Sequence, residues 1–199
     1  MPPVTQALIL ISVCTYLLSM IFGGPLILWF ALWPLGTEFS NGPGFGVWQL
    51  VSYAFLHGGL THLLFNMLAL FMFGSEIEHL FGTRRYLIFI TVCIVTAAIA
   101  QLIVAIVTNS PPYPTVGASG GVFGVLLAFG MNFPHRKIML MIPPIPLPAW
   151  LFVTGYGVLE LYLGVTGSAP GVAHFAHLGG MVGGFLMILW FRKNRRRWR

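Results

Sequence analysis

The chain has 199 residues, of which 57% are hydrophobic and 7% are charged, and its mean hydropathy is +0.88. Soluble domains carry about 25% charged residues, so this composition excludes a soluble enzyme and a disordered chain. A membrane-spanning helix takes about 20 apolar residues. The chain therefore has room for one polytopic membrane domain, expected over residues 1–199, and for no separate soluble domain.

The net charge of +6 is concentrated at three places. All ten basic residues lie in the pairs Arg84-Arg85 and Arg136-Lys137 and in the tail of residues 192–199. Each place lies between or after apolar stretches, which is typical of the cytoplasmic loops of a membrane protein. We expect the tail to contact anionic lipid headgroups, and the charge does not indicate a nucleic-acid partner.

Six apolar runs are separated by clusters of proline and glycine, and each run is predicted to be a membrane-spanning helix. The runs cover residues 7–32, 61–81, 86–107, 119–133, 147–164 and 174–191. The fourth run is the shortest, so the fourth helix is expected to be submerged in the bilayer. With the basic loops in the cytoplasm, both termini are cytoplasmic. The predicted fold class is an all-α membrane protein, a bundle of six transmembrane helices.

The connection over residues 33–59 contains no lysine or arginine but several aromatic side chains. Aromatic side chains are favoured at the membrane–water interface. We therefore interpret this segment either as lying in the interface or as an ordinary outer loop.

Polar residues within the predicted helices are costly in a bilayer and therefore mark candidate sites. The 15 residues from Ser119 to the inner boundary span about 22 Å at 1.5 Å per residue. In a hydrocarbon core about 30 Å thick, Ser119 is thus expected about 8 Å below the outer surface. The same count places His177 and Asn66 at this depth, with His62 one helical turn above Asn66. Three helices therefore bring polar groups to one layer.

These groups suit nucleophilic acyl transfer. Ser119 opens a helix after Gly117-Ala118, where free backbone N–H groups favour developing negative charge. A neutral histidine nearby can accept the serine proton, and Asn66 and His62 are donors suited to a tetrahedral oxyanion. The glycine pairs Gly120/Gly124 and Gly180/Gly184 would let the fourth and sixth helices approach closely.

The acidic residues limit the possible third member of the site. The sequence contains no aspartate, and its four acidic residues are all glutamates. Glu160 is the only one within reach of the polar layer, and we expect a Ser-His dyad. Glu78, with glycine four residues before and after it, is interpreted as a buried bracing carboxylate.

Each residue also has a purely structural interpretation. Ser119 alone could be a helix cap, a lone intramembrane histidine could bridge two helices, and Glu160 could be structural. Phe123, one turn below Ser119, belongs to the core or packs on the histidine ring. The agreement in depth favours a catalytic site over these separate explanations.

Four motifs, in order, resemble those of the rhomboid intramembrane serine proteases, over about residues 47–191. They are His62-x-x-x-Asn66, Gly74-x-x-x-Glu78-x-x-x-Gly82, Gly117-Ala118-Ser119-Gly120 and His177-x-x-Gly180-x-x-x-Gly184. The resemblance implies the minimal six-helix bacterial fold in an inner membrane, with a site opening to the outer face. It also implies cleavage of transmembrane protein substrates without a metal or cofactor.

The resemblance also implies roles. Ser119 is the expected nucleophile, and His177 is the expected base rather than His174, because only His177 has glycine three and seven residues later. His62 and Asn66 are the expected oxyanion donors, together with the Ser119 N–H. The residues expected to support the site or contact substrate are Gly117, Gly120, Phe123 and His174.

Two positions depart from the family pattern. Phe123 stands where the family often has tyrosine, which keeps ring stacking on the base but loses the hydroxyl. Leu32-Trp33-Pro34 stands where the first outer loop of the family has a Trp-Arg pair, so the anchoring of that loop is left open.

Two other functions are alternatives to proteolysis. A non-catalytic, rhomboid-like membrane chaperone would be expected to lack the serine or the histidine, and both are present. A transporter or metal site could use Glu160 and the histidines, but the sequence has no HExxH motif and no charged pair along a path across the bilayer. For the protease, the fifth run is the expected moving part, since it is short and lies between a proline-rich segment and a glycine-rich loop.

Overall fold

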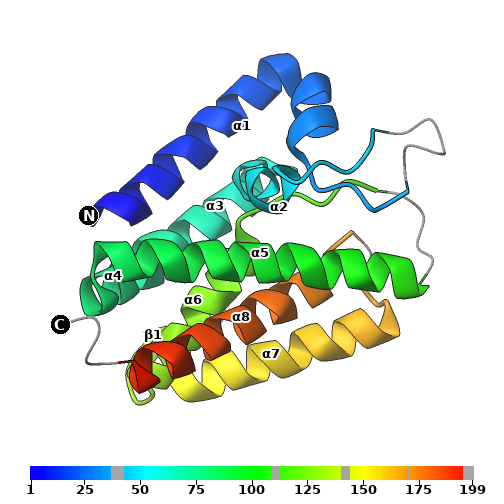
Figure 1. Ribbon diagram of the computed structural model, residues 1–199. Helices are drawn as coiled ribbons and strands as arrows, with labels where there is room; N and C mark the ends of the chain where they lie inside the picture. Colours follow the sequence, from blue (N-terminus) through cyan, green and yellow to red (C-terminus); the bar gives the residue numbers. More distant parts are fainter. Residues whose placement is uncertain (37–42, 109–112, 140–143, 170, 195–199) are drawn as a thin grey trace.

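The computed structural model describes residues 1–36, 43–108, 113–139, 144–169 and 171–194. Its long helices are α1 (Pro3–Phe30), α5 (Thr83–Thr108), α7 (Ala149–Thr166) and α8 (His174–Lys193), with α6 (Ser119–Asn132) shorter. The helices pack side by side, with α1 at one edge and α7 at the other (Figure 1). The predicted all-α membrane bundle is confirmed.

The second predicted span is one continuous helical column with a change of winding. It consists of α3 (Leu60–Ala69), a π-helical turn η3 (Leu70–Gly74) and α4 (Ser75–Phe81). Within the described residues, this column and the four long helices are the five segments apolar and long enough to cross a membrane. The fourth predicted span, α6, has 14 residues and a length of about 21 Å, which is shorter than the hydrocarbon core.

A short antiparallel hairpin joins α6 to α7, and the sequence did not predict it. Strand β1 (Lys137–Met139) pairs with β2 (Pro146–Pro148), with Ile138 opposite Leu147. The fifth helix therefore begins at Ala149, two residues later than predicted, because Leu147 and Pro148 belong to the strand.

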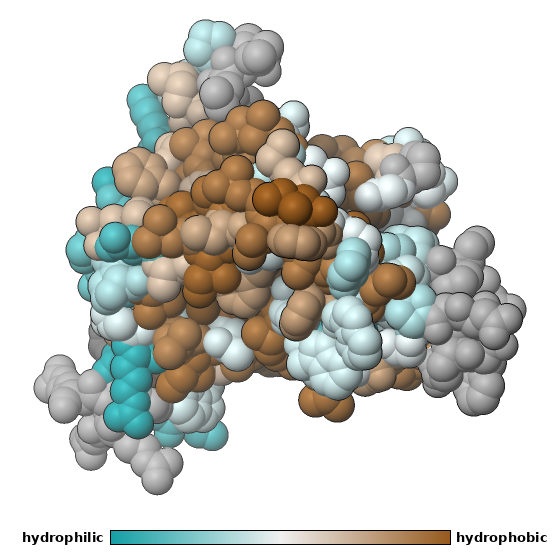
Figure 2. Space-filling view, turned by 90° about the horizontal axis from the view of Figure 1, so that it is seen from above, coloured by the Kyte–Doolittle hydropathy of each residue, from teal (hydrophilic) through white to brown (hydrophobic). Residues whose placement is uncertain are grey.

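Within the described part of the chain, the basic residues lie in segments at one end of the bundle. The start of α1, the turn from α4 to α5, β1 and the end of α8 share that end (Figure 1). Figure 2 shows hydrophobic side chains across the middle of one face and hydrophilic ones gathered toward this end. An apolar belt with hydrophilic side chains gathered at one end is the pattern of a membrane-spanning bundle.

Helix α1 is attached to the bundle through Glu78 on α4. The Glu78 carboxylate accepts hydrogen bonds from the backbone N–H groups of Val4 (3.0 Å) and Thr5 (2.7 Å), in the first turn of α1. Free N–H groups and the helix dipole make a helix start a favourable place for a carboxylate. Glu78 is 1% exposed, so its predicted role as a buried brace agrees with these contacts.

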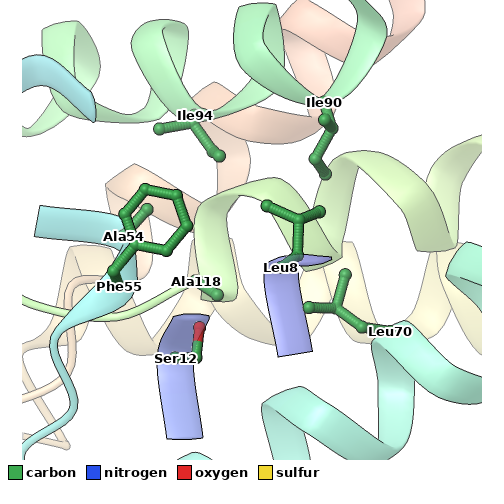
Figure 3. Close-up of a pocket in the computed structure, with 8 residues that line it drawn as sticks. All are labelled: Leu8, Ser12, Ala54, Phe55, Leu70, Ile90, Ile94 and Ala118. Atoms are coloured by element: carbon green, nitrogen blue, oxygen red, sulfur yellow. The ribbon is translucent and has the colours of Figure 1, made fainter. Parts of the chain in front are cut away.

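The middle of α1 packs over the region where η3, α5 and α6 meet. A cavity of about 10 Å³ there is lined by Leu8 and Ser12 on α1, Leu70 on η3, Ile90 on α5 and Ala118 just before α6 (Figure 3). That volume is about the size of one water molecule. Farther along, Phe22 leaves helical geometry three residues before Pro25, and α1 bends there because proline removes a hydrogen bond and clashes with the preceding turn.

Hydrogen bonds of Gln49 and Thr115 anchor the connection that follows α1, whose anchoring the sequence leaves open. Gln49 begins the short helix α2 (Gln49–Ser52), which is followed by a 3-10 turn η2 (Tyr53–Phe55). The Gln49 side-chain oxygen accepts from the Trp33 N–H (3.1 Å), and Leu32 pairs with Thr115 as an isolated bridge. The interfacial position predicted for residues 33–59 stays a prediction, and residues 37–42 lie outside the described part.

Candidate active site

Ser119 and His177 meet at the interface of α6 and α8. Ser119 is the first residue of α6 and His177 lies in the first turn of α8. The Ser119 Oγ and His177 Nε2 atoms are 2.9 Å apart, although the residues are 58 positions apart in the chain. This is hydrogen-bond distance between a hydroxyl and an imidazole.

Glycine contacts allow this approach. A Cβ on Gly180 of α8 would overlap the carbonyl oxygen of Gly120 on α6, and a Cβ on Gly184 would lie 3.2 Å from Gly124 Cα. The two small-residue pairs therefore face each other, as the spacing predicts. Any side chain at Gly180 would push α8 away from α6 and separate His177 from Ser119.

The loop before Ser119 requires glycine. Gly117 has a φ of +125°, which disfavours residues with a Cβ. A Cβ there would also lie 2.6 Å from the His62 ring and 3.7 Å from Ser119 Oγ. The Gly117 N–H donates to the carbonyl of Tyr53 (2.9 Å), and this bond holds the loop against η2.

Phe123 lies beside the imidazole of His177. The two rings are stacked with centroids 4.3 Å apart and planes 6° apart. Phe123 also contacts Tyr156 on α7, with ring centroids 4.9 Å apart. The stacking limits rotation of the imidazole, so that its Nε2 stays directed at Ser119.

Glu160 lies behind His177, on the side away from Ser119. Its Oε2 atom is 2.8 Å from His177 Nδ1 and 2.6 Å from His174 Nδ1. All three side chains are buried. A dyad was expected from the sequence, and the structure adds a carboxylate in hydrogen-bond contact with the second ring nitrogen.

The two predicted oxyanion donors lie on α3 and line the same cavity as Ser119. The His62 ring lies against Gly117, as described above. The Asn66 amide donates to the carbonyl of His62 (3.0 Å), one turn earlier in its own helix. An amide NH₂ carries two protons, so this bond uses one of them.

His57 is a neighbour of the site that the sequence analysis missed. Its ring centroid is 5.1 Å from that of His62. Burial and the neighbouring His62 lower the pKa of His57 to about 4. Its Nε2 atom is buried and has no hydrogen-bond partner within the described part of the chain. His57 lies in an irregular segment before α3, so no helical spacing connects it with the site. Its position five residues before His62 is the one signal in the sequence that could have pointed to it.

A cavity of about 990 Å³ opens onto these residues. Phe65 and Met72 line it from the α3–η3 column, and Phe152 and Tyr156 line it from α7. The cavity extends from Gly171, in the loop before α8, to Met139 in β1. The cavity therefore runs along most of the length of the bundle and passes beside Ser119.

Glu160, His174 and His177 also form a possible metal-binding set. Their candidate ligand atoms all lie within 4.8 Å of one another, and among the described residues no other such group of histidine, cysteine and acidic side chains is found. Both Nδ1 atoms are already at hydrogen-bond distance from the carboxylate, so a metal would have to replace these bonds. The expectation of a metal-free site stays a prediction.

The chain is similar to known proteins over most of its length. A family model described as the Rhomboid domain matches residues 44–194. The chain belongs to the rhomboid family. Relatives of this rhomboid chain include Rhomboid protease GluP of Bacillus subtilis (strain 168), 31% identical over 69% of the chain and 25% of that protein. Rhomboid protease GlpG of Yersinia pestis (strain Pestoides F) is 28% identical over 98% of the chain and 65% of that protein. The chain thus spans a quarter to just under two thirds of the length of these relatives.

Proposed function

We propose that this rhomboid chain is a serine endopeptidase that cleaves transmembrane segments of other membrane proteins. Ser119 is the nucleophile and His177 the general base. The observation that carries the proposal is the 2.9 Å contact between Ser119 Oγ and His177 Nε2, beside a large cavity among apolar helices. A serine hydroxyl becomes a strong nucleophile when a neighbouring base accepts its proton.

The reaction proceeds in two stages. Ser119 Oγ attacks the carbonyl carbon of the scissile bond while its proton passes to His177 Nε2, and the carbonyl oxygen becomes an oxyanion. The intermediate collapses as the imidazolium gives that proton to the leaving amide nitrogen. Water then attacks the acyl-enzyme with His177 again as base, and a new carboxyl terminus leaves as Ser119 is regenerated.

Three groups are suited to stabilising the oxyanion. The N–H of Ser119 is at the start of α6, where backbone donors have no partner within the helix. His62 and Asn66 line the same cavity, and the second amide proton of Asn66 is not used by its bond to the His62 carbonyl. Donors fixed in a site that excludes water stabilise developing charge strongly.

The cavity between the α3–η3 column and α7 supports the proposal that the substrate is a transmembrane segment. Its apolar lining includes Phe65, Met72 and Phe152, which suits a segment arriving from the lipid. Peptide bonds within a helix are shielded and hydrogen-bonded, so the substrate must unwind before Ser119 can reach a carbonyl. Cleavage should therefore favour segments with glycine or other weak helix formers.

The bacterial relatives support an inner-membrane location, and the charge distribution supports an orientation with the site toward the outer face. The basic residues that the structure describes lie in segments at the end of the bundle opposite the loop before α8, and Gly171 in that loop lines the same cavity as Ser119. A non-catalytic binding role is not favoured, because both Ser119 and His177 are present and in contact.

The proposal is tested by labelling with a fluorophosphonate, which reacts with activated serine hydroxyls. The purified protein in detergent should be labelled on Ser119, and Ser119→Ala should not be labelled. Ser75→Ala is the matched control, since Ser75 has a buried hydroxyl on α4 that makes no hydrogen bond within the described part of the chain, and it should label like the wild type. Absence of labelling in the wild type, or labelling of Ser119→Ala, would overturn the proposal.

A further inference from the structure

Glu160 is a buried carboxylate within the membrane-spanning part of the bundle, where an unpaired charge is costly. It is 4% exposed, and its Oε2 atom faces two histidine Nδ1 atoms at 2.6 and 2.8 Å. One of these histidines is the proposed base. The other side of that base faces Ser119, so Glu160, His177 and Ser119 form a continuous series of contacts from α7 through α8 to α6.

The contact with Glu160 selects the tautomer of His177. A neutral imidazole carries one N–H, and the nitrogen without it is the acceptor. A carboxylate beside Nδ1 holds the proton there, which leaves the Nε2 lone pair directed at the Ser119 hydroxyl. In the opposite tautomer Nε2 would carry a proton and could not accept the one from Ser119.

His174 provides the second donor that a buried carboxylate needs. Its Nδ1 atom contacts Glu160 Oε2, and its Nε2 atom lies 3.3 Å from the carbonyl oxygen of Ala169. Both ring nitrogens therefore face oxygen acceptors, which suits an imidazolium with two N–H groups. An ion pair between His174 and Glu160 would balance the carboxylate charge, since buried charges persist when paired and hydrogen-bonded.

We infer that Glu160 is a positioning residue of the reaction, the third member of a Ser119–His177–Glu160 triad, and that His174 holds Glu160 in place. This inference rests on the proposed function. During the attack on substrate, the proton of Ser119 passes to His177 Nε2, and the carboxylate stabilises the imidazolium that forms. Glu160 itself is not protonated and does not touch the substrate.

The main test is the isosteric change Glu160→Gln, measured on a transmembrane substrate in liposomes. We expect kcat to fall by roughly 10²–10⁴-fold, as when a triad carboxylate is replaced by its amide, with KM little changed. The rate of fluorophosphonate labelling should fall in parallel. The matched control is Glu78→Gln, at the buried carboxylate that holds α1. This control should lower the melting temperature without lowering kcat of the folded fraction.

A double-mutant cycle separates positioning from simple structural support. If Glu160 acts through His177, Glu160→Gln should not lower the labelling rate of Ser119 any further in a His177→Ala background, because the effects of residues that act as a unit are not additive. Prolonged fluorophosphonate labelling measures this rate. Equal losses in both backgrounds would overturn the inference.

The wild-type protein provides a second measurement that needs no stable variant. With ¹⁵N-labelled histidine, NMR should show His177 protonated at Nδ1 and unprotonated at Nε2. The opposite tautomer would overturn the inference. Stoichiometric Zn²⁺ in the purified protein that is lost in Glu160→Gln would also overturn it, since the three side chains would then be metal ligands.

The two proposals fail in different ways. If the proposed function is wrong, the wild type itself is not labelled at Ser119. If only the role of Glu160 is wrong, the wild type is labelled and Glu160→Gln reacts at the same rate.

Discussion

Ser119 Oγ lies 2.9 Å from His177 Nε2, and the backbones of α6 and α8 touch at glycines just below this pair. Because a Cβ on Gly180 would overlap the carbonyl oxygen of Gly120, the hydrogen bond and the helix packing depend on each other. The proposed reacting pair is thus fixed by rigid elements, which gives a catalytic pair its precision.

The two histidines of α8 should differ sharply in importance. His177→Ala removes the proposed base and should reduce kcat by at least about 10³-fold, as for members of other serine triads. His174→Ala leaves the base in place and removes one of the two donors to Glu160, so we expect a loss of roughly tenfold. Steady-state cleavage of a transmembrane substrate measures both. The reverse ranking would show that the base has been placed on the wrong turn of the helix.

The oxyanion donors should affect the chemical step more than binding. Asn66→Ala and His62→Ala should each lower kcat by about 10²–10³-fold with a small change in KM. Asn132→Ala is the control, because Asn132 also donates to the carbonyl four residues earlier, at 2.8 Å, but lies at the far end of α6. Equal effects of Asn66→Ala and Asn132→Ala on kcat would mean that Asn66 serves its helix alone.

Substrate entry should depend on the gap between α7 and the α3–η3 column. Phe152 lines the cavity, whereas Trp150 is not among the residues lining it and is 48% exposed. Phe152→Ala should loosen the entrance and raise turnover of a transmembrane substrate severalfold. Trp150→Ala and the reaction with a small water-soluble probe should change little. An effect of equal size on the small probe would indicate a change in the site itself rather than in access.

Cross-linking tests the same gate in the opposite direction. Met72→Cys and Phe152→Cys, in a background without Cys14 and Cys93, would place thiols on opposite walls of the cavity. A cleavable bis-thiosulfonate reagent should reduce substrate turnover, and reduction should restore it. The single-cysteine proteins are the controls. Full activity of the cross-linked enzyme would place the entrance elsewhere.

His57 should make the fold sensitive to mild acid. Its pKa falls from the ordinary value of 6.5 to about 4 in the folded protein, because the ring is buried beside His62. The unfolded chain therefore binds a proton more readily between these values, and stability falls as the pH drops from about 6.5 to 4. Melting temperatures in detergent over this range should decline less for His57→Phe than for the wild type. An identical decline would mean that other groups cause it.

The sequence predicted the helices closely because proline and glycine interrupt its apolar runs. Counting helical rise also placed Ser119 and His177 at the same depth, since both lie a similar number of residues from basic residues that mark the inner boundary. Depth along the membrane normal can be read from a chain in this way.

The rotation of each helix about its own axis, which decides the contacts it makes, could not be read from the sequence in the same way. The rotation of α7 that directs Glu160 at both His174 and His177 depends on packing with α6 and α8, and one apolar helix offers no polar face to reveal it. The π-turn η3, the β1–β2 hairpin and the anchoring by Gln49 arise from tertiary contacts of irregular segments, which have no period to detect. His57 was missed for the same reason.

The most direct test of the account is cleavage by purified protein in liposomes, with the products identified by mass spectrometry. The substrate should carry a single transmembrane segment with glycine near its outer end. The wild type should cut within that segment, and Ser119→Ala, which removes only an oxygen atom at the start of α6, should fold normally and yield no product. Cleavage by Ser119→Ala at the wild-type rate would contradict the central claim that Ser119, activated by His177, is the nucleophile.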